Sequence, residues 1–138
     1  MGFTLSGAGP LPTFTAMDKN NPKRQFSAAS ERNRAPILAV LKRVLPETGL
    51  MVEIGAGSGQ HAAYFAARFP GLQWQPTEPD ADGRASIDAW TVESGAPNLL
   101  AAIDLDVTEA AWPVATAAAM FSANMIHIAP WPRCLGLM

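Results

Sequence analysis

Three glycines at alternate positions, Gly55, Gly57 and Gly59, follow a short apolar run that ends in the acid Glu53. Glycine lacks a Cβ, so the backbone of such a loop can turn sharply and approach a ligand closely. The residues after the loop are typical of a helix, and the first N–H groups of a helix have no partner within it and can face a ligand. The segment 52–61 therefore predicts a strand, a tight turn and a helix that bind a nucleotide-like cofactor.

Further acids follow two later apolar runs. Glu78 ends the run 72–77, and Asp104 and Asp106 end the run 99–103. In an open parallel α/β sheet, ligands bind at the carboxyl ends of the strands, where these carboxylates would meet the glycine loop. A carboxylate at the end of the second strand can accept hydrogen bonds from both hydroxyls of a ribose, which makes Glu78 the ribose candidate. Each of these acids could instead cap the next helix.

The elements that must position these residues alternate between helix and strand. A helix is predicted over 27–45, with Pro36 placed so that 28–34 could form a separate short helix. The apolar runs predict strands over 50–54, 72–77, 99–103 and about 118–121, with helices over 62–69 and 82–93. The start of the fourth strand stays open, because alanine also suits a helix. This alternation predicts a Rossmann-like, doubly wound parallel sheet with about four strands.

Composition and charge exclude several classes of protein. A chain of 138 residues that is 49% hydrophobic and 16% charged fits one globular domain. Ten Lys and Arg against twelve Asp and Glu give a net charge of −2, which argues against a general nucleic-acid-binding protein. No apolar run approaches the roughly 20 residues that span a bilayer. Cys134 is the only cysteine, which is compatible with the cytoplasm, and no metal site is predicted.

Residues 1–23 are predicted to form a weakly ordered tail. The first sixteen residues are rich in Gly, Pro, Ser and Thr and lack the features of a secretory signal. Met17 begins a stretch that could itself be the start of the protein, so the start at Met1 or Met17 stays open. Residues 24–138 are expected to form the cofactor-binding part of the domain.

The spacing of the glycines discriminates between cofactors. A dinucleotide fingerprint needs a small residue where this chain has Gln60, which leaves a nucleotide-dependent oxidoreductase as a minor alternative. The pattern Glu-x-Gly-x-Gly-x-Gly resembles motif I of class I methyltransferases, which bind S-adenosylmethionine. The resemblance implies that the methionine part of this cofactor contacts Glu53, Gly55, Ala56, Gly57 and Gly59.

The same resemblance assigns the remaining parts of the cofactor. It implies that Glu78 holds the ribose and that Asp106 lies beside the adenine. Asp106 is preferred to Asp104 because the segment 107–113 resembles the short spacer and proline that follow this acid in methyltransferases.

Five segments also resemble an uncharacterised family sometimes called methyltransferase-like 26. They are 24–27, 30–33 with 36–38, 52–61, 74–80 and 124–131. The resemblance implies a methyltransferase whose acceptor is unknown. Arg32 and Asn33 are predicted to line the cofactor pocket, since the helix that carries them would pack near the carboxyl ends of the strands.

The histidines have alternative interpretations. Asn124 and His127 follow the fourth strand, where many class I methyltransferases place residues near the transferred methyl group, and His127 could act as a general base. Alternatively, His127 is a hydrogen-bonded histidine in a buried helical turn. His61 is expected to cap a helix or to lie on the surface.

The resemblance stops before a class I methyltransferase fold is complete. These enzymes have a seven-stranded sheet in which a fifth strand flanks the fourth, whereas the strands predicted here stop at four. We therefore expect an incomplete fold with an exposed fourth-strand edge, through which the chain could self-associate. The predicted function is that of a methyltransferase, which the missing strands could leave inactive. The alternative is a non-catalytic module that binds a cofactor or a partner.

Overall fold

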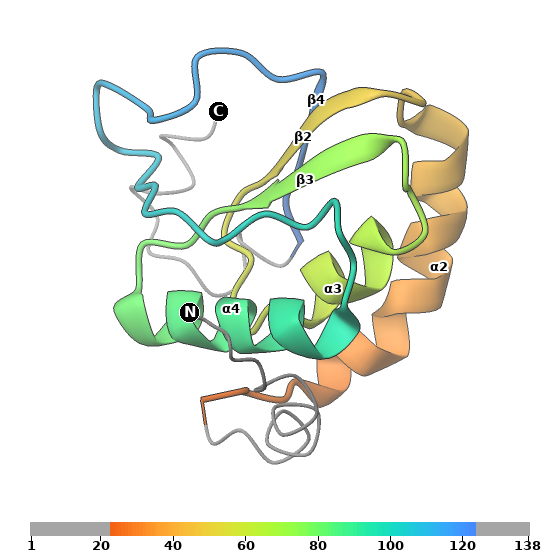
Figure 1. Cartoon of the computed structure of the whole chain (residues 1–138), viewed down its shortest axis with the longest axis horizontal. Helices are drawn as coiled ribbons and strands as arrows, with labels where there is room; N and C mark the ends of the chain where they lie inside the picture. Colours follow the sequence, from red (N-terminus) through yellow and green to blue (C-terminus); the bar gives the residue numbers. More distant parts are fainter. Residues whose placement is uncertain (1–22, 124–138) are drawn as a thin grey trace, which may run out of the picture.

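The computed structural model describes residues 23–123, so the predicted catalytic residues Asn124 and His127 lie outside the described part of the chain (Figure 1). In chain order its elements are α2 (Ala28–Val44), β2 (Gly49–Glu53), α3 (Gln60–Ala66), β3 (Leu72–Pro76), α4 (Ala81–Ser94) and β4 (Ala119–Phe121). Between residues 23 and 123, no helix is long and apolar enough to cross a membrane.

The three strands form one parallel sheet in the order β3-β2-β4. The predicted strand over 99–103 lies alongside β3 but is held only by isolated parallel bridges, from Leu99 to Trp74 and from Ile103 to Thr77. Between the two bridges, a side chain takes the place of the backbone hydrogen bonds of a regular strand pair. Gln75 Nε2 donates a hydrogen bond to the Ala101 carbonyl at 2.8 Å. The parallel topology confirms the predicted Rossmann-like α/β fold.

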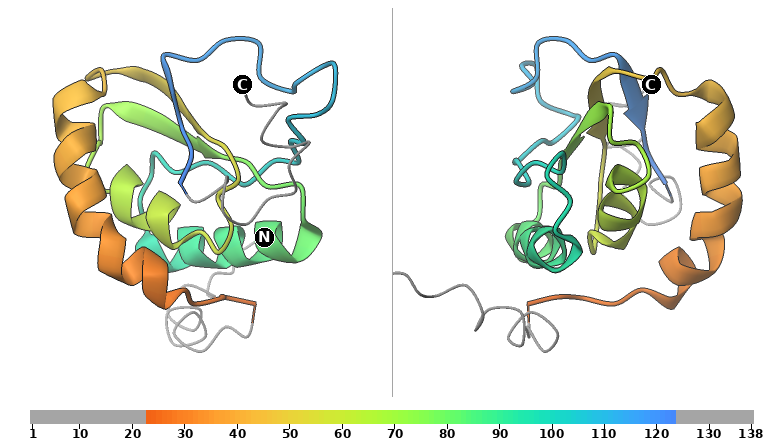
Figure 2. Two further views of the ribbon diagram at one scale, coloured as in Figure 1. Left: turned by 180° about the vertical axis from the view of Figure 1, so that it is seen from behind. Right: turned by 45° about the vertical axis from the view of Figure 1, so that its right-hand side comes forward.

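The two faces of the sheet are covered differently (Figure 2). On one face, α2 and α3 enclose a core built around Phe65 and Trp74, both fully buried. On the other face, Val52 and Ile54 pack against Leu105 and Val107, with Trp112 beside them. Alternate residues of β2 thus enter opposite cores, as the two-residue period of a strand requires.

One continuous helix replaces the two segments that Pro36 suggested. The Ser27 side chain accepts a hydrogen bond from Ser30 N at 3.2 Å and caps the start of α2, and the helix then runs through Pro36 to Val44. Proline removes one helical N–H, but Pro36 lies on an exposed face, where water can reach the backbone carbonyl that loses its partner. The helix therefore continues without a break.

Candidate functional site

The glycine loop connects β2 to α3 and has two distinct sides. Gly55 and Gly57 have φ values of 66° and 60°, and a Cβ added to either would meet no atom within 4 Å. Gly59 has a φ of 95°, and its added Cβ would lie 2.6 Å from Ile87 Cα in α4. Gly55 and Gly57 therefore leave open space beside the backbone, whereas Gly59 allows the loop to pack on α4.

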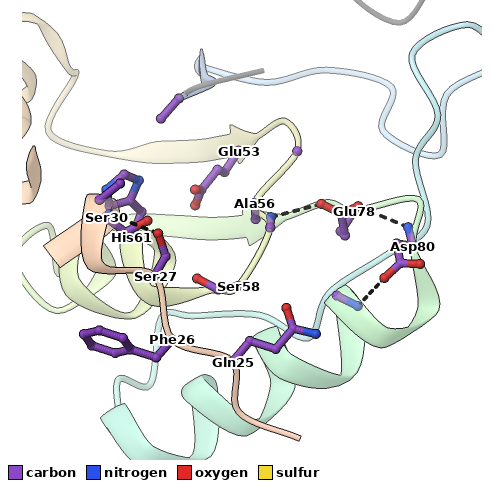
Figure 3. A pocket seen from close by; sticks show the side chains of 15 residues that line it. Gln25, Phe26, Ser27, Ser30, Glu53, Ala56, Ser58, His61, Glu78 and Asp80 are labelled. Atoms are coloured by element: carbon purple, nitrogen blue, oxygen red, sulfur yellow. Dashed lines mark hydrogen bonds between the residues drawn. The ribbon is translucent and has the colours of Figure 1, made fainter. Parts of the chain in front are cut away.

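A cavity of about 630 Å³ opens beside this loop, at the carboxyl ends of β2 and β3 (Figure 3). The predicted residues that line it are Glu53, Gly55, Ala56, Gly57 and Glu78. Gly59 is not among the lining residues. The structure thus brings together five predicted residues from two strand ends and one loop, at the edge where parallel α/β sheets bind ligands.

Glu53 forms a buried part of the cavity wall. Glu53 is 2% exposed, and its Oε2 accepts a hydrogen bond from Trp74 Nε1 at 2.8 Å. Burial raises the pKa of the Glu53 carboxyl to about 7, and the hydrogen bond from Trp74 partly opposes this rise. Glu53 is consequently divided between its neutral and ionised forms near neutral pH.

Glu78 is attached to the glycine loop by its side chain. Its Oε1 accepts from Gly57 N at 3.0 Å, and its Oε2 accepts from Asp80 N at 3.1 Å. Gly83 gives the side chain room, because a Cβ at Gly83 would lie 2.7 Å from Glu78 Cγ. These contacts fix a carboxylate at the cavity edge while leaving further acceptor positions on both oxygens.

His61 is buried, and the expectation that it lies on the surface is wrong. It is 5% exposed in the first turn of α3, where it lines the cavity and its ring centroid lies 5.2 Å from that of Phe65. Its Nε2 is 2.8 Å from Asn33 Oδ1. Burial lowers the pKa of His61, the Arg34 charge lowers it further, and a hydrogen bond with the Ser30 backbone opposes both.

The other predicted residues within 23–123 do not line the cavity. Asn33 is adjacent through His61, whereas Arg32 is exposed on α2. Asp106 Oδ1 accepts from Thr108 N and Oγ1, at 3.0 and 2.7 Å, as a turn-capping carboxylate does. Asp104 lies 3.6 Å from Arg84 in an ion pair.

A segment that we call the strap, residues 24–30, completes the cavity, and its residues Gln25, Phe26 and Ser27 were not predicted as part of the site. Gln25, Phe26, Ser27 and Ser30 of the strap line the cavity. The strap is bound to the start of α3 by Gln60, whose buried side-chain Oε1 accepts a hydrogen bond from Ser27 N. The resemblance over 24–27 included part of this segment but assigned no role in the site to its residues.

No metal centre is apparent among residues 23–123, where no three His, Cys, Asp or Glu side chains gather closely enough to hold an ion.

Most of the chain matches one protein family. Residues 24–138 match the family described as "Protein of unknown function (DUF938)". The chain belongs to the DUF938 family. The family description assigns no activity.

Solved methyltransferases share the fold of this DUF938 protein. Coclaurine N-methyltransferase bound to N-methylheliamine and SAH has a TM-score of 0.57 at 11% identity, over 72% of this chain and 30% of that one. A SAM-dependent methyltransferase from Thiobacillus denitrificans, in complex with S-adenosyl-L-homocysteine, has a TM-score of 0.55 at 14% identity, over 92% and 50% of the two chains. Its counterpart from Geobacter sulfurreducens, with the same ligand, has a TM-score of 0.55 at 16% identity, over 90% and 48%.

The DUF938 chain thus spans half or less of the length of each of these three structures. What it shares with them is a Rossmann-like α/β fold.

Proposed function

We propose that this DUF938 protein binds S-adenosylmethionine in the cavity and transfers its methyl group to an acceptor that is not identified. The observation that carries the proposal is the attachment of Glu78 to Gly57 N, beside two glycines whose Cβ positions are open. The carboxylate that would bind the ribose and a loop that is open to a ligand are thus held together at one edge of the sheet. The three solved structures of the same fold contain S-adenosyl-L-homocysteine, which supports this choice of cofactor.

The proposed orientation of the cofactor follows from the two ends of the cavity. Glu78 would accept hydrogen bonds from the ribose hydroxyls, because its carboxylate has acceptor positions left beyond those used by Gly57 and Asp80. The adenine would extend toward Asp104 and Asp106, since Glu78 N donates to the Ile103 carbonyl at 3.0 Å.

The methionine part would lie over the glycine loop and Glu53. A cationic group beside the buried Glu53 would favour its ionised form and so be attracted to it. When bound, the cofactor supplies an electrophilic methyl group on sulfur. The protein would position that group and exclude water. His127 is proposed as the base for a hydroxyl or amine acceptor, and Asn124 as a second catalytic residue. Arg32 and Asn33 are proposed to support this side of the site from α2.

Calorimetric titration with S-adenosylhomocysteine tests the proposal. Glu78→Ala should weaken binding by about 10- to 100-fold, because a hydrogen bond to a charged group contributes about 1.5–3 kcal/mol. Glu78→Gln should retain more affinity, because its amide oxygen can still accept from Gly57. Glu109→Ala, an exposed carboxylate outside the cavity lining, is the matched control and should bind normally. Binding of NAD without any response to S-adenosylhomocysteine would refute the proposal and favour an oxidoreductase.

A non-catalytic interaction module is the second candidate, and the edge of β4 favours it. Within residues 23–123, β4 pairs with β2 along one edge and with no strand along the other, and Met120 is 53% exposed. An unpaired strand edge can add a strand from a second copy of the chain. Light scattering should then show a dimer that Met120→Lys converts to a monomer, whereas Val92→Lys on α4 should leave it intact. A monomeric unsubstituted protein would exclude this self-association.

A further inference from the structure

Phe26 is an unusually exposed aromatic residue at the cavity. Phe26 is 68% exposed, although it lines the cavity beside the glycine loop. It belongs to neither apolar cluster of the described chain. A large apolar side chain that is exposed at a cavity would gain free energy by burial against an apolar part of a ligand.

The backbone on both sides of Phe26 is fixed by residues of α3 and α4. Gln25 N donates to Ser86 Oγ at 2.8 Å, and this hydroxyl donates to the Ser58 carbonyl of the glycine loop at 2.6 Å. The Gln25 carbonyl accepts from Trp90 Nε1 at 2.8 Å. On the other side, Ser27 N donates to Gln60 Oε1. The strap thus holds Phe26 at the cavity instead of letting it fold back into a core.

The position of Phe26 indicates which end of a ligand it would meet. Figure 3 shows Phe26 on the side of the cavity where Ser27 and His61 lie, with Glu78 and Asp80 on the opposite side. If Glu78 holds the ribose, a ligand that crosses the glycine loop brings its sulfur and amino-acid chain to the side of Phe26.

We propose that Phe26 packs against the thioether and the methionine chain of the bound cofactor and shields the reacting sulfur from water. This assignment rests on the proposed function and makes Phe26 a cofactor-binding residue. Its aromatic ring suits the contact, because sulfur and methylene groups pack favourably against aromatic rings. The strap then acts as the wall that closes the methyl-transfer end of the cavity.

The test compares two ligands in calorimetric titrations of the full chain. Phe26→Ala should weaken S-adenosylhomocysteine binding by about tenfold, as expected for the loss of most of an apolar contact, and Phe26→Leu should lose less. Adenosine keeps the base and ribose but lacks the thioether and amino-acid chain, so its affinity should change less than about twofold. Val44→Ala removes an apolar side chain of similar exposure, 66%, at the far end of α2, and should change neither affinity.

Three results would overturn the assignment. Unchanged binding of S-adenosylhomocysteine to Phe26→Ala would show that the ring makes no contact with the cofactor. Equal losses for S-adenosylhomocysteine and adenosine would place the contact on the nucleoside. An unsubstituted protein that binds neither ligand would refute the proposed function and, with it, the role of Phe26. Thermal unfolding of each variant, expected to match the unsubstituted protein, separates these results from misfolding.

Discussion

The buried carboxyl of Glu53 makes the stability of this protein depend on pH in a defined direction. Burial raises its pKa from 4.5 to about 7 in the folded chain. Between these two values the unfolded chain loses the Glu53 proton while the folded chain keeps it, so stability falls as pH rises. The penalty is absent well below pH 4.5 and complete above about pH 7, and at 1.36 kcal/mol per pKa unit it reaches about 3 kcal/mol.

Glu53→Gln isolates this contribution. The amide cannot ionise, and its oxygen can still accept the hydrogen bond from Trp74 Nε1. The difference in free energy of unfolding between Glu53→Gln and the unsubstituted protein should therefore shift by about 3 kcal/mol in favour of Glu53→Gln as the pH rises from about 4 to about 8. Urea denaturation of both proteins at both pH values measures this difference, and contributions from all other groups cancel in it.

A second variant should increase the pH dependence of stability that Glu53→Gln removes. Trp74→Phe removes the hydrogen bond that lowers the pKa of Glu53, so its stability should fall more steeply with rising pH than that of the unsubstituted protein. The reasoning fails if Glu53→Gln and the unsubstituted protein lose stability in parallel over this range, since Glu53 would then titrate alike in the folded and unfolded chains.

Three further predictions follow from individual residues. Gly59→Ala should destabilise the protein by about 1–3 kcal/mol more than Gly95→Ala in urea denaturation, because its Cβ would collide with Ile87 whereas that of Gly95 meets no atom within 4 Å. Similar losses for the two variants would contradict the packing role of Gly59. Asn98→Ala should cost about 3 kcal/mol, because Nδ2 donates to the carbonyls of residues 66, 69 and 72, and an unchanged melting temperature would count against this. The lowered pKa of His61 means that stability is lost as pH falls through 6.5, when the unfolded chain binds a proton that the folded chain resists; His61→Gln should lose less stability on acidification, and an equal loss would disprove the assignment.

Local patterns in the sequence were enough to locate most of the fold. The strand before the glycine loop was predicted over 50–54 and is found at Gly49–Glu53, and the strand predicted over 72–77 is found at Leu72–Pro76. The helix predicted over 82–93 is found at Ala81–Ser94, ending at Gly95 with a φ of 65°. These signals are local, since apolar runs, glycines and helix stops act on their immediate neighbours.

The run 99–103 shows the limit of local patterns. Its apolar residues predicted a regular strand, but Ala102 N donates to Asp88 Oδ1 at 2.9 Å instead of entering a ladder. This acceptor comes from α4, and its position cannot be deduced from the sequence around residue 102. The break in the strand was therefore decided by a contact between distant segments.

That Glu53, the glycine loop and Glu78 would meet at one edge of a parallel sheet follows from the amino-acid sequence alone, because each ends or follows a strand. The tertiary structure decided what encloses them. Contacts between residues far apart in the chain, such as Gln25 with Ser86 and Ser27 with Gln60, bring the strap over the loop. Gln60, which in the sequence only argued against a dinucleotide, is part of that enclosure. No local pattern encodes the burial that lowers the pKa of His61, nor the contacts that leave Phe26 exposed at the cavity.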